Sequence, residues 1–243
     1  MANLDSIARL AELDGVLLVD KPTNISSHDV VKAVKQHFNL VKVGHGGTLD
    51  PNATGLFIIL LGNATRLSAD LMGGDRTYSG VLRLGRTTNT YDREGETLAE
   101  KPFDGITREQ VEAVVRKEFL GDSFQKPPAF SVIKMPAHVT YDVVRTAEES
   151  ERKEHLVHVY RMAVTDFAPP RVAFEMSCTK GTMPRALVHD LGQFLGCGAS
   201  LDELRRTRCG KFSLDDAIGF MDLLKLDAPG FRARAIPMSE VGR

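Results

Sequence analysis

The chain has 243 residues, of which 42% are hydrophobic and 26% are charged, and its formal net charge at pH 7 is −1. This composition is ordinary for a folded globular protein and excludes a disordered or collagen-like chain. The balanced charge also excludes a binder of nucleic acid that relies on a basic excess over its whole surface, so any such site must be a local patch.

Membrane and disulfide signals are missing from the sequence. The longest apolar run is too short to span a bilayer, and the N-terminal stretch MANLDSIARLAELDG lacks the basic flank and apolar block of a secretory signal. Cys178, Cys197 and Cys209 are an odd number without a C-x-x-C pair, which indicates neither a disulfide framework nor a zinc site. We therefore expect a cytoplasmic protein.

The first quarter of the chain predicts two buried strands separated by a helix and a loop. GVLLVD, residues 15–20, predicts a short strand that ends at a Lys-Pro pair, because proline cannot donate to a ladder. Ser26 or Ser27 can cap a helix that ends near His37. The apolar run GLFIILLG, residues 55–62, predicts a strand buried on both faces.

The rest of the chain alternates between helix and strand signals. We predict a short helix over 64–72, a strand over 76–90, a helix over 107–119, paired strands over 156–167 and 171–181, a helix from Pro184, and an amphipathic helix over 213–226. Residues 121–160 are interrupted by prolines and carry a charge run, so we interpret them as an inserted, mobile arm. Without a regular βαβ rhythm, these signals predict an α+β fold with a mixed, largely antiparallel sheet.

One segment is the best candidate for a local basic patch. The stretch LDELRRTRCGKF, residues 201–212, carries four basic side chains against two acidic ones. Taken alone, such a segment is more typical of a solvated surface.

The loop GHGGTLDPNATG, residues 44–55, crowds glycine and proline around Asp50. Glycines let the backbone approach a ligand closely, and rigidly framed loops often carry catalytic groups. An aspartate before proline is also a common turn former, so the pattern alone leaves both interpretations open. The glycine spacing does not match G-x-G-x-x-G and no helical pattern follows directly, which argues against a dinucleotide or P-loop site.

Three further residues are candidates for a site. His45 can be a general base, a stacking platform or a loop histidine bonded locally. Tyr78 can stack on a base or pack in a core as a strand tyrosine. Arg185 is a cation in the first turn of a predicted helix, which suggests that a specific carboxylate holds it. These residues suggest a site but name no reaction.

Several motifs together resemble the TruB-type tRNA pseudouridine synthases, and they follow the family order from about residue 15 to 215. Five separated motifs at the family's intervals do not arise from composition. They are GVLLVDKPTNISSHDVV, KVGHGGTLDPNATGLFIILLGNATRL, DRTYSGVLRLGRTTNTYDREG, QKPPAFSVIK and SCTKGTMPRALVHDLGQFLGCGASLDELRRTRCGKFSL. The resemblance implies the pseudouridine synthase catalytic fold and isomerisation of uridine to pseudouridine at position 55, in the T-arm loop of tRNA.

The resemblance places the family's catalytic aspartate at Asp50. A carboxylate suits this reaction because uracil must be detached from its ribose, turned and rejoined through carbon, while an oxygen nucleophile can hold one partner covalently. Attack at the sugar C1′, attack at the base C6, and assistance in loss of the 2′ proton all remain open. By the same resemblance, Arg185 pairs with Asp50 and keeps it ionised.

The resemblance also implies roles for residues that meet the substrate. The target base must leave the folded tRNA, at a cost of about a few kcal/mol. Tyr78 is expected to stack on the flipped uracil, His45 to occupy the space that the base vacates, and Leu204 to form an apolar wall of the pocket. Lys21, with Pro22, is expected to support the catalytic loop.

The implied organisation is one catalytic domain with additions. Residues 1–14 form an N-terminal extension, residues 15–215 form the catalytic domain with a thumb-like insertion at about 121–160, and residues 216–243 form a C-terminal tail shorter than the family's usual RNA-binding domain. No metal or organic cofactor is implied. The expected partner is the tRNA T-arm stem-loop, and the expected state is a monomer.

The chain departs from the family pattern at three places. Met183 and Pro184 stand where an aromatic-aliphatic pair is usual, so the helix that carries Arg185 is expected to start differently. Arg76 replaces a usual lysine, which conserves charge but not shape. Asn89 replaces a usual aspartate, and if that aspartate steadies Arg185, the amide predicts slower turnover.

These departures leave two alternatives to the T-arm enzyme. One is a non-catalytic RNA-binding or tRNA-folding module on the same scaffold, and the other is the same chemistry on another RNA. Retention of Asp50, Tyr78 and Arg185 favours an enzyme.

Overall fold

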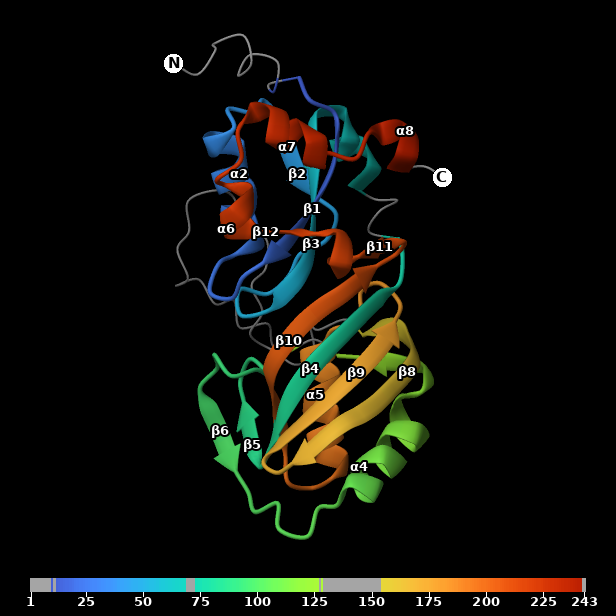
Figure 1. Cartoon of the computed structure of the whole chain (residues 1–243). Helices are drawn as coiled ribbons and strands as arrows, with labels where there is room; N and C mark the ends of the chain where they lie inside the picture. Colours follow the sequence, from blue (N-terminus) through green and yellow to red (C-terminus); the bar gives the residue numbers. More distant parts are fainter. Residues whose placement is uncertain (1–9, 11, 69–72, 127, 129–153, 242–243) are drawn as a thin grey trace. The chain divides into compact units, whose positions relative to one another are not determined.

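The structure, a computed structural model, describes residues 10, 12–68, 73–126, 128 and 154–241. The chain forms two compact units, of which the first comprises Met1–Tyr78 with Arg205–Arg243 and the second comprises Ser79–Leu204. The division falls within strands β4 (Arg76–Leu84) and β10 (Ala199–Cys209), so each unit contains part of both strands (Figure 1).

The first unit contains a mixed sheet. Its remaining elements are β1 (Gly15–Lys21), α2 (Ser27–His37), β2 (Val43–His45), β3 (Thr54–Leu61), η1 (Gly62–Leu67), β11 (Phe212–Ser213), η4 (Leu214–Asp216), β12 (Ile218–Gly219), α6 (Phe220–Leu223), α7 (Ala228–Arg234) and α8 (Met238–Val241). β1 pairs antiparallel with β3 and parallel with β12, while β3 also pairs antiparallel with β2 and parallel with β10. This arrangement gives β3 a neighbour on both sides.

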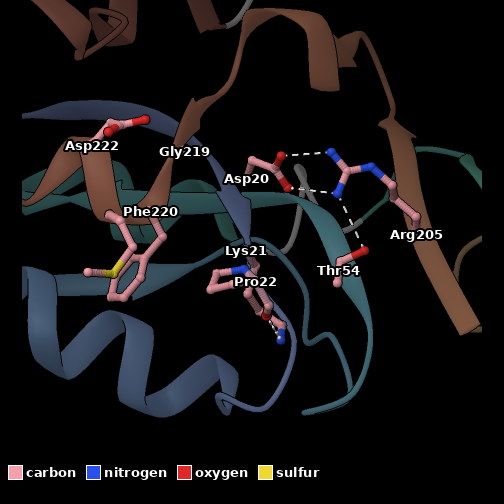
Figure 2. Close-up of a pocket in the computed structure, with 9 residues that line it drawn as sticks. Asp20, Lys21, Pro22, Thr54, Arg205, Gly219, Phe220 and Asp222 are labelled. Atoms are coloured by element: carbon pink, nitrogen blue, oxygen red, sulfur yellow. Dashed lines mark hydrogen bonds and ion pairs between the residues drawn. The ribbon is translucent and has the colours of Figure 1, made fainter.

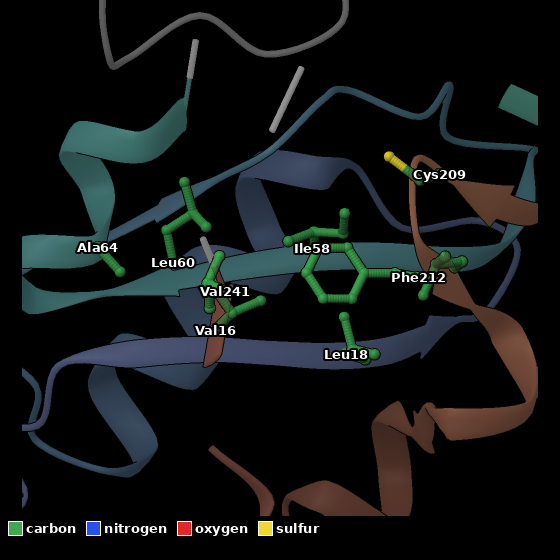
Figure 3. Close-up of a cluster of buried hydrophobic side chains, with 9 residues drawn as sticks. Val16, Leu18, Ile58, Leu60, Ala64, Cys209, Phe212 and Val241 are labelled. Carbon is green, nitrogen blue, oxygen red and sulfur yellow. The ribbon is translucent and has the colours of Figure 1, made fainter. Parts of the chain in front are cut away.

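The core of the first unit forms around β3. The predicted strand with two buried faces is confirmed, because every residue from Gly55 to Leu61 is buried. Figure 3 shows Ile58 and Leu60 of β3 in one apolar cluster with Val16 and Leu18 of β1. Since β3 begins directly after the loop that contains Asp50, this core fixes one end of that loop.

The second unit contains the antiparallel part of the fold. Its elements, besides its parts of β4 and β10, are β5 (Arg86–Thr88), β6 (Thr97–Glu100), α4 (Arg108–Val114), the π-helix η2 (Val115–Phe119), β7 (Gly121–Gln125), β8 (His155–Ala168), β9 (Arg171–Cys178) and α5 (Pro184–Phe194). The strand order is β10-β4-β9-β8-β7, and β5 pairs with β6 separately. The predicted pairing of two strands around 168–170 is confirmed as β8 with β9. The predicted α+β class with a mixed, largely antiparallel sheet is confirmed as well.

The helices with clear start signals form where the sequence predicts them. Ser26 caps α2, and its side chain accepts a hydrogen bond from the Asp29 amide. Thr107 and Gln110 form a reciprocal capping box at α4, which satisfies two otherwise unpaired amides. Pro184 occupies the first turn of α5, where its missing N–H costs nothing.

Two predictions of local structure are wrong. Residues 213–226 form no single amphipathic helix, because the chain passes through η4 and β12 before the short helix α6. Residues 201–212 are not a solvated segment, because most of them belong to β10 and Arg206 is only 2% exposed. The short helix predicted at 64–72 is confirmed where it is described, because residues 64–67 belong to the 3-10 helix η1 and residue 68 is also helical, while residues 69–72 lie outside the described residues.

The segment predicted as an inserted arm is only partly described. Its two ends, β7 and the start of β8, pair antiparallel from Gly121↔Val159 to Gln125↔His155. Residues 127 and 129–153 lie outside the described residues. Among the described helices, none is long and apolar enough to cross a membrane.

We expect Ile58→Ala to lower the free energy of unfolding by about 2–5 kcal/mol, because it leaves a cavity in a fully buried cluster. The measurement is urea denaturation. Val41→Ala is the matched control, since Val41 is 70% exposed and its truncation should change stability by less than about 0.5 kcal/mol. An equal loss in both variants would contradict the assignment of the core.

Candidate active site

Lys21 is fully buried, and its ammonium group fastens the loop that carries Asp50. Its Nζ donates hydrogen bonds to the backbone carbonyl groups of Pro22 at 2.9 Å, Ile25 at 2.8 Å and Pro51 at 3.1 Å. Burial lowers the pKa of Lys21 to about 8, because a charged amine is costly away from water. Attraction to Asp50 acts in the opposite direction and favours the charged amine.

Arg206 holds the same loop from the opposite strand. Its Nε donates to the Leu56 carbonyl at 2.8 Å, and its two terminal nitrogens donate to the carbonyl groups of Gly47 and Thr48 at 3.3 and 3.4 Å. A planar guanidinium can reach several acceptors at once, which a single ammonium group on a flexible stem cannot do in the same geometry. No pattern in the sequence predicts this buried role.

The two cations lie on either side of Gly55 in the sheet. Gly55 of β3 is the register partner of Lys21 in β1 and of Arg206 in β10. Its φ is +96°, and a Cβ atom there would lie 2.3 Å from the Arg206 carbonyl oxygen. Only glycine fits such a position, so the residue that ends the loop is fixed by backbone contact.

Ser27 supplies a third fixed point, directly before Asp50. The Ser27 hydroxyl donates to the Leu49 carbonyl at 2.8 Å and accepts from the Leu49 amide at 2.9 Å. Asp50 itself is half-buried, and its backbone carbonyl accepts a hydrogen bond from the Ala53 amide at 3.1 Å. Its carboxylate therefore projects from a backbone held on both sides, which is the arrangement that a preorganised nucleophile requires.

His45 and Tyr78 also belong to the first unit. The His45 Nδ1 accepts a hydrogen bond from the Gly47 amide at 3.3 Å. The local bonding considered for this histidine is therefore present. Tyr78 is 6% exposed and lies on the same face of β4 as the buried Arg76. Their roles toward a substrate stay predictions.

A pocket of about 260 Å³ opens beside Lys21. Figure 2 shows it between the end of β1, Arg205 of β10 and the start of α6. Arg205 binds both oxygens of Asp20, at 3.0 and 2.7 Å, and also reaches the Thr54 hydroxyl at 3.4 Å. This bidentate pair ties β10 to β1 across β3, which reinforces the strands that carry both loop-holding cations.

In the second unit, the carboxylate beside Arg185 is Asp92. Arg185 is 9% exposed and Asp92 is 5% exposed, and Nη1 of Arg185 lies 3.6 Å from Oδ2 of Asp92. The predicted carboxylate partner of this arginine therefore exists. Sequence reasoning missed Asp92, although it follows Asn89 by only three residues and lies within a quoted motif.

Asn89 and Leu204 have structural surroundings of their own. The Asn89 side-chain oxygen accepts a hydrogen bond from the Glu96 amide at 3.1 Å, in the turn between β5 and β6. Leu204 is 8% exposed in β10. Arg185 and Asp50 belong to different units, so their pairing stays a prediction. The substrate contacts expected of Arg185 and Leu204 also stay predictions.

The departure at Met183 and Pro184 leaves α5 with a defined start. The Gln125 side chain donates to the Met183 carbonyl at 2.9 Å and accepts from the Met183 amide at 2.8 Å. Gln125 is 1% exposed, so this pair of bonds holds the residue before the helix without a capping side chain. Arg185 consequently lies in the first turn of α5, as the sequence predicts.

No group of three or more His, Cys, Asp and Glu that could hold a metal ion occurs within the part of the chain that the structure describes.

Comparison with known proteins assigns the chain to one group. A family model described as TruB family pseudouridylate synthase (N terminal domain) matches residues 35–183, and one described as tRNA pseudouridylate synthase B C-terminal domain matches residues 185–230. Proteins named tRNA pseudouridine synthase B are 44% identical in Opitutus terrae, over 93% of this chain and 94% of the relative, and 39% identical in Dechloromonas aromatica, over 93% and 75%.

Solved structures give the same fold. The chain is similar to one in the crystal structure of a Cbf5-Nop10-Gar1 complex, with a TM-score of 0.73 and 30% identity, over 96% of this chain and 63% of that chain. It is also similar to one in the structure of an H/ACA RNP bound to a substrate RNA containing 2′-deoxyuridine, with a TM-score of 0.70 and 27% identity, over 96% and 62%.

We expect Arg206→Lys to lower the free energy of unfolding by about 1–3 kcal/mol, because it leaves buried carbonyl groups without donors. Urea denaturation measures the change. Arg208→Lys is the matched control, since Arg208 is exposed two residues later in the same strand and should tolerate the change. Equal stability of the two variants would refute the holding role of Arg206.

Lys21 should make stability depend on pH in an alkaline window. Its folded pKa of about 8 lies below its ordinary value of 10.5, so between these values the unfolded chain binds more protons and stability rises with pH. We expect the unfolding free energy of the wild type, minus that of Lys21→Met, to increase from pH 8 to 10.5. The exposed Lys35→Met is the matched control for general effects of alkaline pH, and a flat result for Lys21 would contradict the lowered pKa of its buried amine.

Proposed function

The chain belongs to the TruB family of pseudouridylate synthases, and we propose that it acts on the uridine at position 55 in the T-arm loop of tRNA. It is a tRNA pseudouridine synthase, which isomerises uridine to pseudouridine. The T-arm target follows the family's specificity. A cytoplasmic, monomeric enzyme is part of the same proposal.

The observation that carries the catalytic assignment is the clamped loop around Asp50. Side chains of Lys21, Ser27 and Arg206 hold the backbone at residues 47, 48, 49 and 51, so the carboxylate between them needs little reorganisation before reaction. Attraction between Asp50 and Lys21 favours the charged form of the buried amine that holds the loop. We assign Asp50 as the catalytic residue on this basis.

The reaction is balanced without a co-reactant. The C1′–N1 bond of uridine breaks, a C1′–C5 bond forms, the proton on C5 leaves, and N1 gains a proton. Asp50 can act at the sugar C1′, at the base C6 or in removal of the 2′ proton, and each route uses its ionised carboxylate. The substrate and product are isomers, so the protein has to supply orientation and charge rather than redox equivalents.

Access to the base requires that the uridine leave the loop stack, at a cost of about a few kcal/mol. We propose that Tyr78 stacks on the flipped uracil, that His45 fills the space left in the RNA loop, and that Leu204 lines the pocket. Arg185 is proposed to bind at the reacting nucleotide. Asp92 supports this role, because it supplies a buried carboxylate beside Arg185 while residue 89 is an amide.

The decisive test is conversion of an unmodified T-arm stem-loop labelled at uridine C5, with release of the C5 hydrogen as the readout. We expect the wild type to convert the loop uridine. We expect Asp50→Asn to abolish conversion while its Kd for the stem-loop changes by less than about threefold, because the amide keeps the size of the side chain but cannot act as a carboxylate.

Asp104→Asn is the matched control, since Asp104 is exposed in the loop after β6 and should keep the wild-type rate. An anticodon stem-loop controls for RNA specificity. Binding of the T-arm without conversion by the wild type would support the RNA-binding module, and conversion of only another uridine in whole tRNA would overturn the T-arm target. Normal turnover by Asp50→Asn would remove the catalytic assignment.

A further inference from the structure

The turn before Asp92 touches helix α5 through an aromatic pair. The rings of Tyr91 and His189 stack with centroids 3.7 Å apart and an angle of 15° between their planes. His189 follows Arg185 by four residues, so both side chains lie on one face of α5. Two consecutive residues of the turn, Tyr91 and Asp92, therefore meet two residues one helical turn apart.

The ion pair in this arrangement is loose. Oδ2 of Asp92 lies 3.6 Å from Arg185, which is beyond the range of a good charged hydrogen bond. The other carboxylate oxygen, Oδ1, accepts from the Thr90 hydroxyl at 2.6 Å and from the Glu94 amide at 3.0 Å. These contacts fix Asp92 relative to its own turn but not relative to α5. The distance between Asp92 and α5 therefore depends on other contacts between the turn and the helix.

The backbone of the turn is held separately. The Leu201 amide of β10 donates to the Tyr91 carbonyl at 2.9 Å, and the Arg93 amide donates to the Leu201 carbonyl at 2.9 Å. Tyr91 adopts φ = +66°, a conformation that residues with a Cβ rarely adopt. In this conformation the aromatic ring meets His189 while the next residue faces Arg185. The ring contact gives a physical reason for tyrosine at a position where glycine or asparagine would be less strained.

We propose that the stack of Tyr91 on His189 is a positioning device for Arg185, acting by setting the distance between Asp92 and the guanidinium. The proposal rests on the proposed function of Arg185 at the reacting nucleotide. Tyr91 and His189 are positioning residues in this scheme, and neither has to touch the RNA. The stack sets how closely the turn lies to α5. The position of the turn then determines the distance between Asp92 and Arg185.

The test is single-turnover conversion of the T-arm stem-loop with the full chain at saturating enzyme, which separates the rate from the folded fraction and from affinity. An aromatic pair contributes enough for its loss to slow the step about two- to tenfold. We expect Tyr91→Ala and His189→Ala each to show this fall, with Kd for the stem-loop changed by less than about twofold. The double variant should be no slower than the slower single variant.

Two further sets of variants test whether the ring contact and Asp92 account for the change in rate. Tyr91→Phe and His189→Phe keep a ring at each position and should restore most of the rate. In an Asp92→Asn background, Tyr91→Ala should cause little additional loss, because the residue through which the stack acts is already altered. If the alanine variants do not fold, Tyr91→Leu and His189→Leu replace them, since leucine keeps apolar volume without a ring face.

Phe194→Ala is the matched control. It removes another aromatic contact of α5, with Phe119 at 5.8 Å between centroids, and should lower stability without changing the single-turnover rate. Wild-type rates in both Tyr91→Ala and His189→Ala, or losses that multiply in the double variant, would overturn the positioning role.

The same assay separates this proposal from the function on which it rests. Arg185→Gln should lose far more activity than either stacking variant. If it does so while the stacking variants react normally, the positioning proposal alone fails. If Arg185→Gln reacts normally, the proposed role of Arg185 fails, and the positioning proposal fails with it.

Discussion

The loop that carries Asp50 depends on two buried cations that donate to backbone carbonyl groups. Proline has no backbone N–H to donate, and buried carbonyl groups without donors are costly. Lys21 and Arg206 supply donors on both sides of Gly55, from strands that pair with β3. The conformation of the loop is therefore set by the sheet rather than by the preferences of its own residues.

These cations also give a physical reason for an acid at position 50. Two positive groups buried near each other repel, and Arg206 accordingly contributes to the lowered pKa of Lys21. A carboxylate at residue 50 partly offsets that repulsion, because its attraction favours the charged form of Lys21. One arrangement thus holds the loop and offsets part of the repulsion between its two cations. Structural support and electrostatic support come from the same side chains.

The sequence predicts those parts of the fold that rest on local signals. The caps at Ser26 and Thr107 and the apolar run of β3 act within a few residues, and the structure confirms each of them. The strand β10 could not be recognised in this way, because its buried Arg206 finds its partners about 150 residues earlier in the chain. The helix predicted at 213–226 failed for a similar reason, since β12 forms through tertiary pairing with β1.

The candidate site shows the same distinction between features with local sequence signals and features that depend on distant segments. The pattern around Asp50 indicates a loop suited to chemistry, and the motif resemblance names the aspartate. The clamp by Ser27 and Arg206 depends on hydrogen bonds between distant segments, for which one sequence carries no direct signal. Asp92 is different, because it lies in a quoted motif and Arg185 was expected to need a carboxylate.

The two units hold their proposed functional side chains by different means, and this difference has energetic consequences. In the first unit the contacts act on the backbone around Asp50, so weakening them costs stability through unsatisfied buried groups as well as alignment. In the second unit, Asp92 and the ring pair act on side chains along one face of α5, while Gln125 separately secures the start of that helix. Contacts there therefore act on the alignment of side chains rather than on the course of the backbone. The two units thus hold their proposed functional groups at different levels, through the backbone around Asp50 and through side chains around Arg185.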